Sequence, residues 1–168
     1  MNDIIQKIMP ATTGMSQTTG NAWPAKAESR GVRNNNPLNI RHNRKNRWEG
    51  MAEEQTDRRF VRFVSPVMGY RAAFVTLKNG YFGRGVNTIG RIIARWAPSA
   101  DGNDTQAYID FVSRHTGIAA DEPLHFGQER QMVDMVCAMT QMESGIVADR
   151  HTVDRGYLMA LETGKELK

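Results

Sequence analysis

Cysteine is nearly absent from this 168-residue chain, in which Cys137 is the one copy. A lone cysteine excludes an internal disulfide and a metal site built from several thiolates. Cys137 stands in an apolar segment, which favours a buried structural thiol over a nucleophile. Long hydrophobic runs are also lacking. None approaches the roughly 20 residues that a bilayer-spanning helix needs, so no membrane insertion is expected.

Several chemistry-bearing motifs are missing as well. The sequence contains no phosphate-binding loop, no dinucleotide fingerprint, no Gly-x-Ser-x-Gly and no His-Glu-x-x-His. Its four histidines are scattered without metal-ligand spacing, so we expect neither a metal nor an organic cofactor. The N-terminus lacks the basic and apolar regions of a secretory signal, so any extracytoplasmic action is expected to depend on another route, such as lysis or delivery by a particle.

Positive charge is in excess, with a formal net charge of +4 and a sequence pI of about 9.5. Such a balance fits a polyanionic partner, either a nucleic acid or an acidic cell-wall polymer. The sequence contains no recognisable nucleic-acid-binding motif and no regular basic helix, so a nucleic acid is the less favoured partner.

The chain divides into a tail and one domain. Residues 1–27 are rich in Thr, Gly and polar residues without periodicity, which predicts a flexible tail, and residues 28–168 are expected to form a single domain. Within the domain, "NRWEGMA" and "RRFVRFV" are typical of short strands and predict a small β-hairpin lobe near the N-terminal side. Helical periodicity then predicts helices within residues 65–82, 87–98, 103–117, 128–145 and 152–164. The predicted fold class is therefore mainly α.

Glu143 is the carboxylate that physical chemistry singles out. It stands in the last turn of the apolar segment 128–145, at the negative end of the helix dipole. Burial would act in the same direction and raise the pKa of the carboxyl. A carboxylic acid that is protonated at neutral pH is what protonation of a glycosidic oxygen requires. The residues alone leave open the alternative of an exposed glutamate that tolerates its position.

Five blocks of the chain resemble a family of phage virion proteins and prophage structural proteins. These blocks are "RGVRNNNPLNIRHNRKNRWEG", "RFVRFVSPVMGYRAA", "TIGRIIARWAP", "NDTQAYIDFV" and "MESG", and the match as a whole covers roughly residues 30–161. The chain departs from the family's pattern at Leu38, where the family usually has glycine. We therefore expect the turn after Pro37 to differ.

A second resemblance bears on mechanism. "NPLNIRHNRKNRWEG" and "FVSPVMGYRA" are similar to successive blocks of flagellar-type glucosaminidases of the lysozyme superfamily, in which a preceding helix ends in Glu-Ser-Gly with a catalytic glutamate. Here that motif comes last, in "MTQMESG". "TQAYIDFV" likewise resembles the segment of lytic transglycosylases whose tyrosine lines the site. The order implies a lysozyme-like, circularly permuted domain.

This resemblance implies roles for particular residues. Glu143 becomes the general acid/base, and Tyr108 and Asn36 are expected to orient the substrate in one cleft with it. The remaining substrate-binding predictions are Asn39, Trp48 and Ser144.

Two other carboxylates compete for a catalytic role. Glu28 precedes the Asn-rich block in an unpermuted order, but no apolar helix supports it. Asp57 is the preferred second carboxylate, against the alternative of a solvated hairpin charge. A lytic transglycosylase would need no second carboxylate, because a hydroxyl of the sugar itself attacks.

The predicted function is a peptidoglycan-cleaving glycosidase, of the muramidase or lytic transglycosylase type, acting on glycan strands of the cell wall. We expect it in a phage particle or the host cytoplasm, with action in the periplasm or cell wall, and we expect other virion proteins to bind residues 1–27. The alternative is a virion structural or adaptor protein that keeps the lysozyme-like fold without catalysis.

Overall fold

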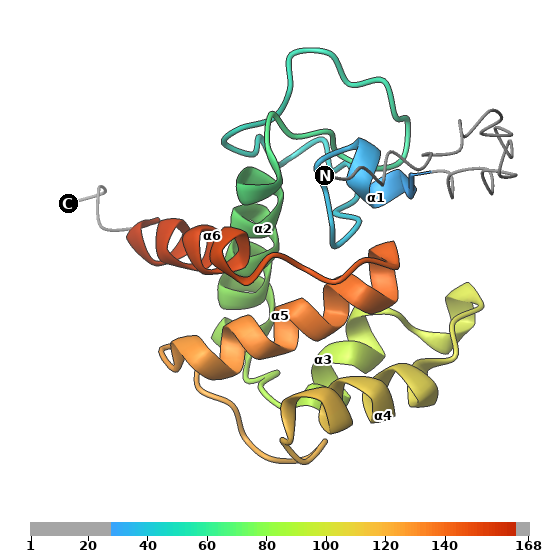
Figure 1. Ribbon diagram of the computed structural model, residues 1–168, viewed down its shortest axis with the longest axis vertical. Coiled ribbons are helices and arrows are strands. Elements are labelled where there is room, and N and C mark those ends of the chain that lie inside the picture. The colour runs from blue at the N-terminus through green and yellow to red at the C-terminus, as the bar shows by residue number, and fades with distance from the viewer. Residues whose placement is uncertain (1–27, 164–168) are drawn as a thin grey trace, which may run out of the picture.

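The computed structural model describes residues 28–163, and helices dominate that part of the chain (Figure 1). The α-helices are α1 (Arg30–Arg33), α2 (Pro66–Thr76), α3 (Ile89–Trp96), α4 (Thr105–Thr116), α5 (Glu129–Ser144) and α6 (Arg150–Glu162). A π-helical turn, Leu77–Tyr81, and two 3-10 turns, Phe82–Arg84 and Ser99–Asp101, complete the helical elements. The prediction of a mainly α protein is confirmed. The tail predicted for residues 1–27 lies outside the described residues.

Helix α5 runs through the middle of the helical assembly and contacts α1, α4 and α6 (Figure 1). Its buried side chains are mostly apolar and include Met132, Val133, Val136 and Met139. Burial of this stripe from water is the main favourable term that holds such a helix in place. The C-terminal end of α5 is therefore fixed to the core rather than frayed.

Helices α2 and α6 pack closely against each other. Gly156 of α6 lies so near the α2 backbone that a Cβ there would meet Tyr70 Cβ and the Arg71 amide nitrogen. Beside this crossing, the rings of Phe74 and Tyr157 meet edge to face with centroids 5.3 Å apart. No helix within residues 28–163 has the length and apolar character to cross a membrane.

Helix termini follow the local sequence. Asp104 accepts a hydrogen bond from the Ala107 amide at the start of α4, and Asp149 does the same for Thr152 at the start of α6. Gly117 and Gly145 end α4 and α5 with φ angles of 70° and 67°, a left-handed conformation that glycine adopts without a steric cost.

The lobe formed by residues 34–64 contains little regular β structure. Two isolated antiparallel bridges, Arg41 with Phe60 and Met51 with Phe63, stand where the sequence predicts a β-hairpin. Side chains take over backbone hydrogen bonds in this lobe: the Asn36 amide donates to the carbonyls of Ile40 and Val61 and accepts from the Ile40 N–H. The hairpin is thus present only as a pair of bridged loops.

Candidate active site

The carboxyl group of Glu143 lies at the junction of three segments of the fold. The Tyr108 hydroxyl, on α4, donates to Glu143 Oε1 over 3.2 Å. The Asn39 side-chain amide, in the loop after Pro37, donates to Glu143 Oε2 over 3.1 Å and to the Glu143 backbone carbonyl over 3.2 Å. Both carboxylate oxygens are therefore held by the protein, and the side chain has a fixed orientation.

Burial raises the pKa of Glu143 above that of an ordinary glutamate, because a charged carboxylate loses hydration in this position. The hydrogen bonds from Asn39 and Tyr108, the Trp96 side chain and the positive charge of Arg41 all act in the opposite direction and oppose the rise. Burial is the larger effect. The pKa of Tyr108 is raised, first by burial and then by the neighbouring Glu143, so Tyr108 remains a hydrogen-bond donor.

The position of Asn39 depends on an unusual backbone. Asn39 has a φ of 54°, in the left-handed region that Asn tolerates better than most residues. Its N–H donates to the Asn36 carbonyl, and the Ser144 hydroxyl donates to the Pro37 carbonyl over 2.7 Å. Gly31 of α1 supports the same loop, since a Cβ there would clash with Ser144 Oγ and meet the Asn36 carbonyl at 3.0 Å. The loop is thereby docked onto the end of α5.

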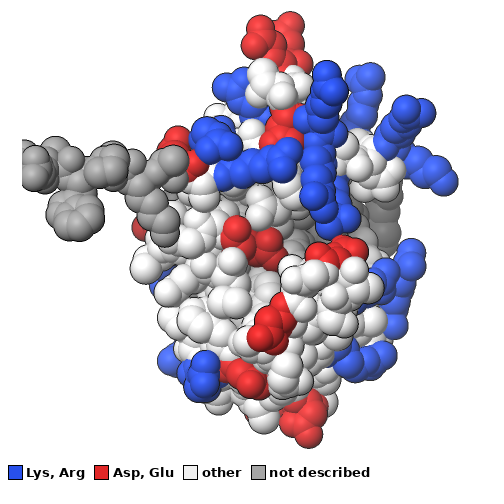
Figure 2. Space-filling model, turned by 90° about the vertical axis from the view of Figure 1, so that its right-hand side faces the viewer, with Lys and Arg blue, Asp and Glu red and all other residues white. Residues whose placement is uncertain are grey.

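Glu143 lines a cavity of about 190 Å³ that is open to solvent. Trp96, Arg41 and Asp101 share this cavity, and Arg41 Nη2 lies 3.3 Å from Asp101 Oδ2 in an ion pair whose members are both exposed. Figure 2 shows that Lys and Arg side chains gather in the upper part of one face, with carboxylates both above and below them. In Figure 1 residues 40–64 form this upper part of the molecule. Glu143 is therefore reachable from solvent while most of its carboxyl is shielded.

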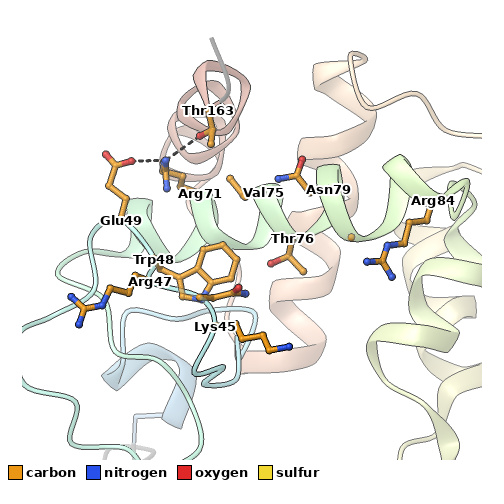
Figure 3. Close-up of a pocket in the computed structure, with 12 residues that line it drawn as sticks. Lys45, Arg47, Trp48, Glu49, Arg71, Val75, Thr76, Asn79, Arg84 and Thr163 are labelled. Carbon is orange, nitrogen blue, oxygen red and sulfur yellow. Dashed lines mark hydrogen bonds and ion pairs between the residues drawn. The ribbon is translucent and has the colours of Figure 1, made fainter. Parts of the chain in front are cut away.

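Trp48 does not line the Glu143 cavity. Its ring lies along α2 beside Thr76, in a neighbouring hollow (Figure 3). The indole Nε1 is buried without a hydrogen-bond partner among the described residues. Trp48 therefore lines a surface that is continuous with the site but does not contact Glu143.

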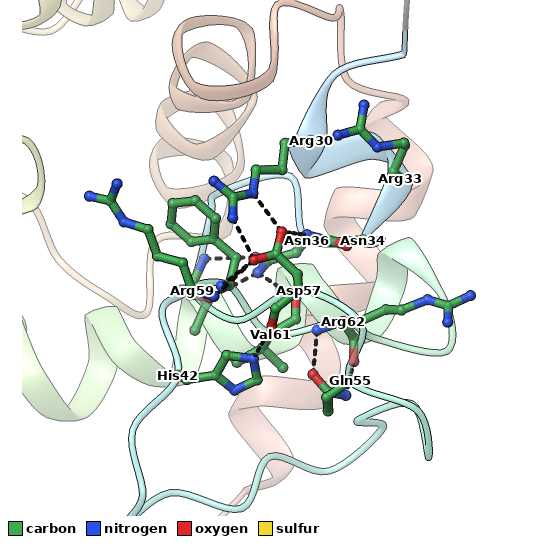
Figure 4. Close-up of polar contacts among 12 residues, drawn as sticks. Arg30, Arg33, Asn34, Asn36, His42, Gln55, Asp57, Arg59, Val61 and Arg62 are labelled. Carbon is green, nitrogen blue, oxygen red and sulfur yellow. Dashed lines mark hydrogen bonds and ion pairs between the residues drawn. The ribbon is translucent and has the colours of Figure 1, made fainter.

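Asp57 lies in a different cavity, with Arg30, Arg33 and Asn34. Its carboxylate accepts hydrogen bonds from the Arg30 guanidinium, from the Asn34 amide and from the backbone N–H groups of Arg59 and Phe60 (Figure 4). These donors, the Arg30 guanidinium foremost, hold the pKa of Asp57 well below its usual range. The carboxylate is fully occupied, so this arrangement disfavours Asp57 as a partner of Glu143.

The other predicted residues lie in mixed positions. Asn36 is completely buried, and its amide forms hydrogen bonds within the lobe. It therefore does not line the cavity as predicted. Asn39 lies beside Glu143 instead. Ser144 is also buried and holds Pro37 rather than facing the cavity. Glu28 is exposed, and its backbone carbonyl accepts a hydrogen bond from the Arg33 guanidinium.

Trp96, Arg41 and Asp101 are among the cavity-lining residues that were not predicted as site residues. Trp96 fits the apolar periodicity of its helix, which predicts a position in the core. Arg41 is one of many cations in a basic stretch, and no feature distinguishes Asp101 in the sequence. Only the fold brings them to Glu143. Within residues 28–163, no cluster of three or more His, Cys, Asp or Glu side chains could hold a metal ion.

Fold and site together define a mainly helical domain with one fixed, shielded carboxyl group in a surface cavity. The chain belongs to the same family as Protein P5 of the Pseudoalteromonas phage PM2. The two are 40% identical over 119 residues, which cover 70% of this chain and 72% of the relative. The chain is thus related to a phage protein, as its sequence blocks predict. No protein-family model matches the chain.

Proposed function

We propose that this protein is a peptidoglycan-cleaving glycosidase with a lysozyme-like, circularly permuted fold, in which Glu143 is the general acid/base. The observation that carries the proposal is the environment of Glu143: a shielded carboxyl group at the end of a rigid helix, with a raised pKa and both oxygens held by Tyr108 and Asn39. An acid of this kind retains its proton closer to neutral pH and can deliver it to a glycosidic oxygen.

The reaction can proceed with one acid/base. Protonated Glu143 gives its proton to the glycosidic oxygen as the bond from that oxygen to the anomeric carbon breaks. The carboxylate that remains then takes the proton of a hydroxyl on the same sugar as that hydroxyl oxygen bonds to the anomeric carbon. The product is an anhydro sugar and Glu143 is protonated again. Asn39 and Tyr108 would stabilise the carboxylate between these steps, since both donate to it.

Among the described residues, no unpaired second carboxylate lines the Glu143 cavity, and this favours lytic transglycosylase chemistry over hydrolysis. Asp57 is held by Arg30 in another cavity, and Asp101, which does share the cavity, is paired with Arg41. Hydrolysis with two carboxylates would require Asp101 to leave Arg41 and act on a water or on the sugar. The relationship to a phage protein is consistent with a place in the phage particle, from which the enzyme would open a path through the cell wall.

The proposal is tested by incubating the full chain with purified peptidoglycan and identifying the released fragments by mass spectrometry. Anhydro-muropeptides are expected, and fragments with reducing ends would assign hydrolysis instead. Glu143→Gln should release at least about a hundredfold less, as expected for loss of an acid/base group. Glu129→Gln is the matched control, because it makes the same change at the exposed opposite end of α5.

Two results would overturn the proposal. If correctly folded wild-type protein releases no fragments, the alternative of a non-catalytic virion structural protein takes its place. If Glu143→Gln releases as much as Glu129→Gln, the acid/base lies elsewhere, and Glu28 and Asp101 become the residues to change next.

A further inference from the structure

The cavity at Glu143 is one end of a longer groove. It shares Asn39, Arg41 and Trp96 with a second hollow of about 610 Å³. That hollow in turn shares its lining with a third, of about 690 Å³, which runs along α2 to Arg71 and Thr163 (Figure 3). The shared lining of the second and third hollows consists of Lys45, Asn46, Trp48 and Thr76. The three hollows therefore adjoin one another through the side chains that they share.

Cations outnumber carboxylates along this groove. We call its second and third hollows the basic groove, whose cations are Arg41, Arg44, Lys45, Arg47, Arg71 and Arg84. Arg71 is paired with Glu49, and Arg41 with Asp101. In the part of the chain that the structure describes, the other four cations have no ion-pair partner. These charges are available to a ligand.

Aromatic side chains lie between the cations. Trp48 lines both hollows of the basic groove, and its buried Nε1 has no hydrogen-bond acceptor among residues 28–163. Tyr81 and Trp96 line the hollow next to Glu143, with ring centroids 5.8 Å apart. Flat rings suit the stacking of sugar rings. The groove thus combines surfaces for rings with isolated positive charges.

We propose that the basic groove binds the carboxylates of the peptide stems that branch from a peptidoglycan strand, beside the sugars that enter the Glu143 cavity. This inference rests on the proposed function and names what the enzyme recognises in its substrate. Stem carboxylates are separated charges, and Arg44, Lys45 and Arg47 can each pair with one. A strand whose sugars occupy the Glu143 cavity would bring its stem carboxylates to the adjoining basic groove, where the carboxylate present, Glu49, is already paired with Arg71.

The test measures binding without cleavage, using the full chain with Glu143→Gln as the parent. Its sedimentation with teichoic-acid-free peptidoglycan sacculi gives an affinity, and sacculi whose peptide carboxylates have been amidated give a second one. The groove variant adds Arg44→Gln and Arg47→Gln. The matched control adds Arg114→Gln and Arg155→Gln, which remove the same charge from exposed positions on α4 and α6 outside the groove.

The parent and the control should bind untreated sacculi about fivefold more tightly than amidated sacculi, as expected for two exposed charge pairs. The groove variant should lose most of this preference, keeping only the part due to Lys45 and Arg84, and its melting temperature should match that of the control. Added salt should weaken the parent's binding to untreated sacculi alone.

Three results would overturn the inference: no sedimentation of the parent, equal binding of the parent to both kinds of sacculi, or equal losses in the groove and control variants. A loss of affinity for single-stranded DNA in the groove variant, with sacculus binding unchanged, would assign the groove to nucleic acid instead. Fragment release by the wild type is measured separately, so failure of this inference is distinguishable from failure of the proposed function.

Discussion

Asn39 and Glu143 stand 104 residues apart in the chain, yet the Asn39 amide donates to both the side chain and the backbone carbonyl of Glu143. This one side chain therefore ties the loop after Pro37 to the end of α5 and orients the proposed acid/base. Its donation to the backbone carbonyl also stabilises a group at the end of the helix that has no partner within the helix.

Two substitutions of Asn39 distinguish the effect of its side-chain amide from the effect of its backbone conformation. Asn39→Gly removes the donors but permits a φ of 54°, whereas Asn39→Ala removes the donors and strains the backbone. We expect both to release peptidoglycan fragments about tenfold more slowly, because the carboxyl loses its orientation. Loss of the Asn39 donor should also raise the pKa of Glu143 further and move the alkaline limb of the pH–rate profile upward.

Stability should distinguish the two variants. Asn39→Ala should be about 1 kcal/mol less stable than Asn39→Gly in urea denaturation, the cost of a left-handed non-glycine residue. Equal stabilities would contradict the importance assigned to this backbone conformation. A pH–rate profile unchanged in either variant would contradict the influence of Asn39 on Glu143.

Gly31 provides a second test of how the loop is held. A methyl group at this position would clash with Ser144 Oγ, so Gly31→Ala should lower the free energy of unfolding by about 1–3 kcal/mol. Because the clash is with the hydroxyl, the cost of Gly31→Ala should be smaller when Ser144→Ala is also present. Urea denaturation of the two single variants and the double variant measures this coupling.

Gly80→Ala is the control for this cycle, because a Cβ at Gly80 meets no atom within 4 Å. It should change stability by less than about 1 kcal/mol. Additive effects of Gly31→Ala and Ser144→Ala would show that the two residues do not meet.

Much of the helical architecture could be predicted from the sequence because its signals are local. Apolar spacing, an aspartate before α4 and a glycine after α5 each act within a few residues of the helix end that they mark. The lobe of residues 34–64 was predicted less well. Alternation in "RRFVRFV" is typical of a strand, but asparagine side chains take several of the backbone partners that a hairpin would use.

The candidate site could also be predicted only in part, because some of its contacts depend on the fold and not on local signals. The hypothesis for Glu143 came from its place at the end of a helix and that for Tyr108 from the resemblance of its segment to lytic transglycosylases, and the structure brings the two residues together. The sequence could not show which asparagine of "NNNPLN" faces Glu143, because that depends on the turn around Pro37. The pairing of Asp57 could not be predicted because its partner Arg30 lies 27 residues away on a helix, α1, that shows no sequence periodicity.

Asp57 should be a structural residue whose effect depends on pH. Its pKa is lowered by the Arg30 guanidinium, so its contribution to stability is present above the ordinary aspartate pKa of about 4 and is lost as pH falls toward its folded-state pKa. Asp57→Asn should therefore be about 1–2 kcal/mol less stable than the wild type at pH 7, with a smaller difference at pH 3. Denaturation at both pH values measures it.

Asp121→Asn is the control for this prediction, since Asp121 is exposed and lies in a turn. It should change stability little at either pH. A deficit of Asp57→Asn that is equally large at pH 3 and pH 7 would mean that packing, and not the ionised carboxylate, accounts for the loss.

Glu143 should have the opposite pH dependence. Its folded-state pKa is raised by burial, so below the unfolded value of about 4.3 both states keep the proton and the residue carries no ionisation cost. As pH rises through the interval between the two pKa values, the unfolded state releases its proton first, and the folded state loses stability relative to it.

Glu143→Gln cannot ionise and keeps a side chain of the same size. It should therefore be more stable than the wild type at pH 7, by about 1 kcal/mol as is common when a functional residue is neutralised, and equal to it near pH 3.5. Urea denaturation at the two pH values measures the difference without any assay of activity, and Glu129→Gln should show no such gain. A Glu143→Gln variant that is less stable than the wild type at pH 7 would mean that the hydrogen bonds from Asn39 and Tyr108 outweigh burial, and Glu143 would then be an ordinary ionised carboxylate, unsuited to donate a proton.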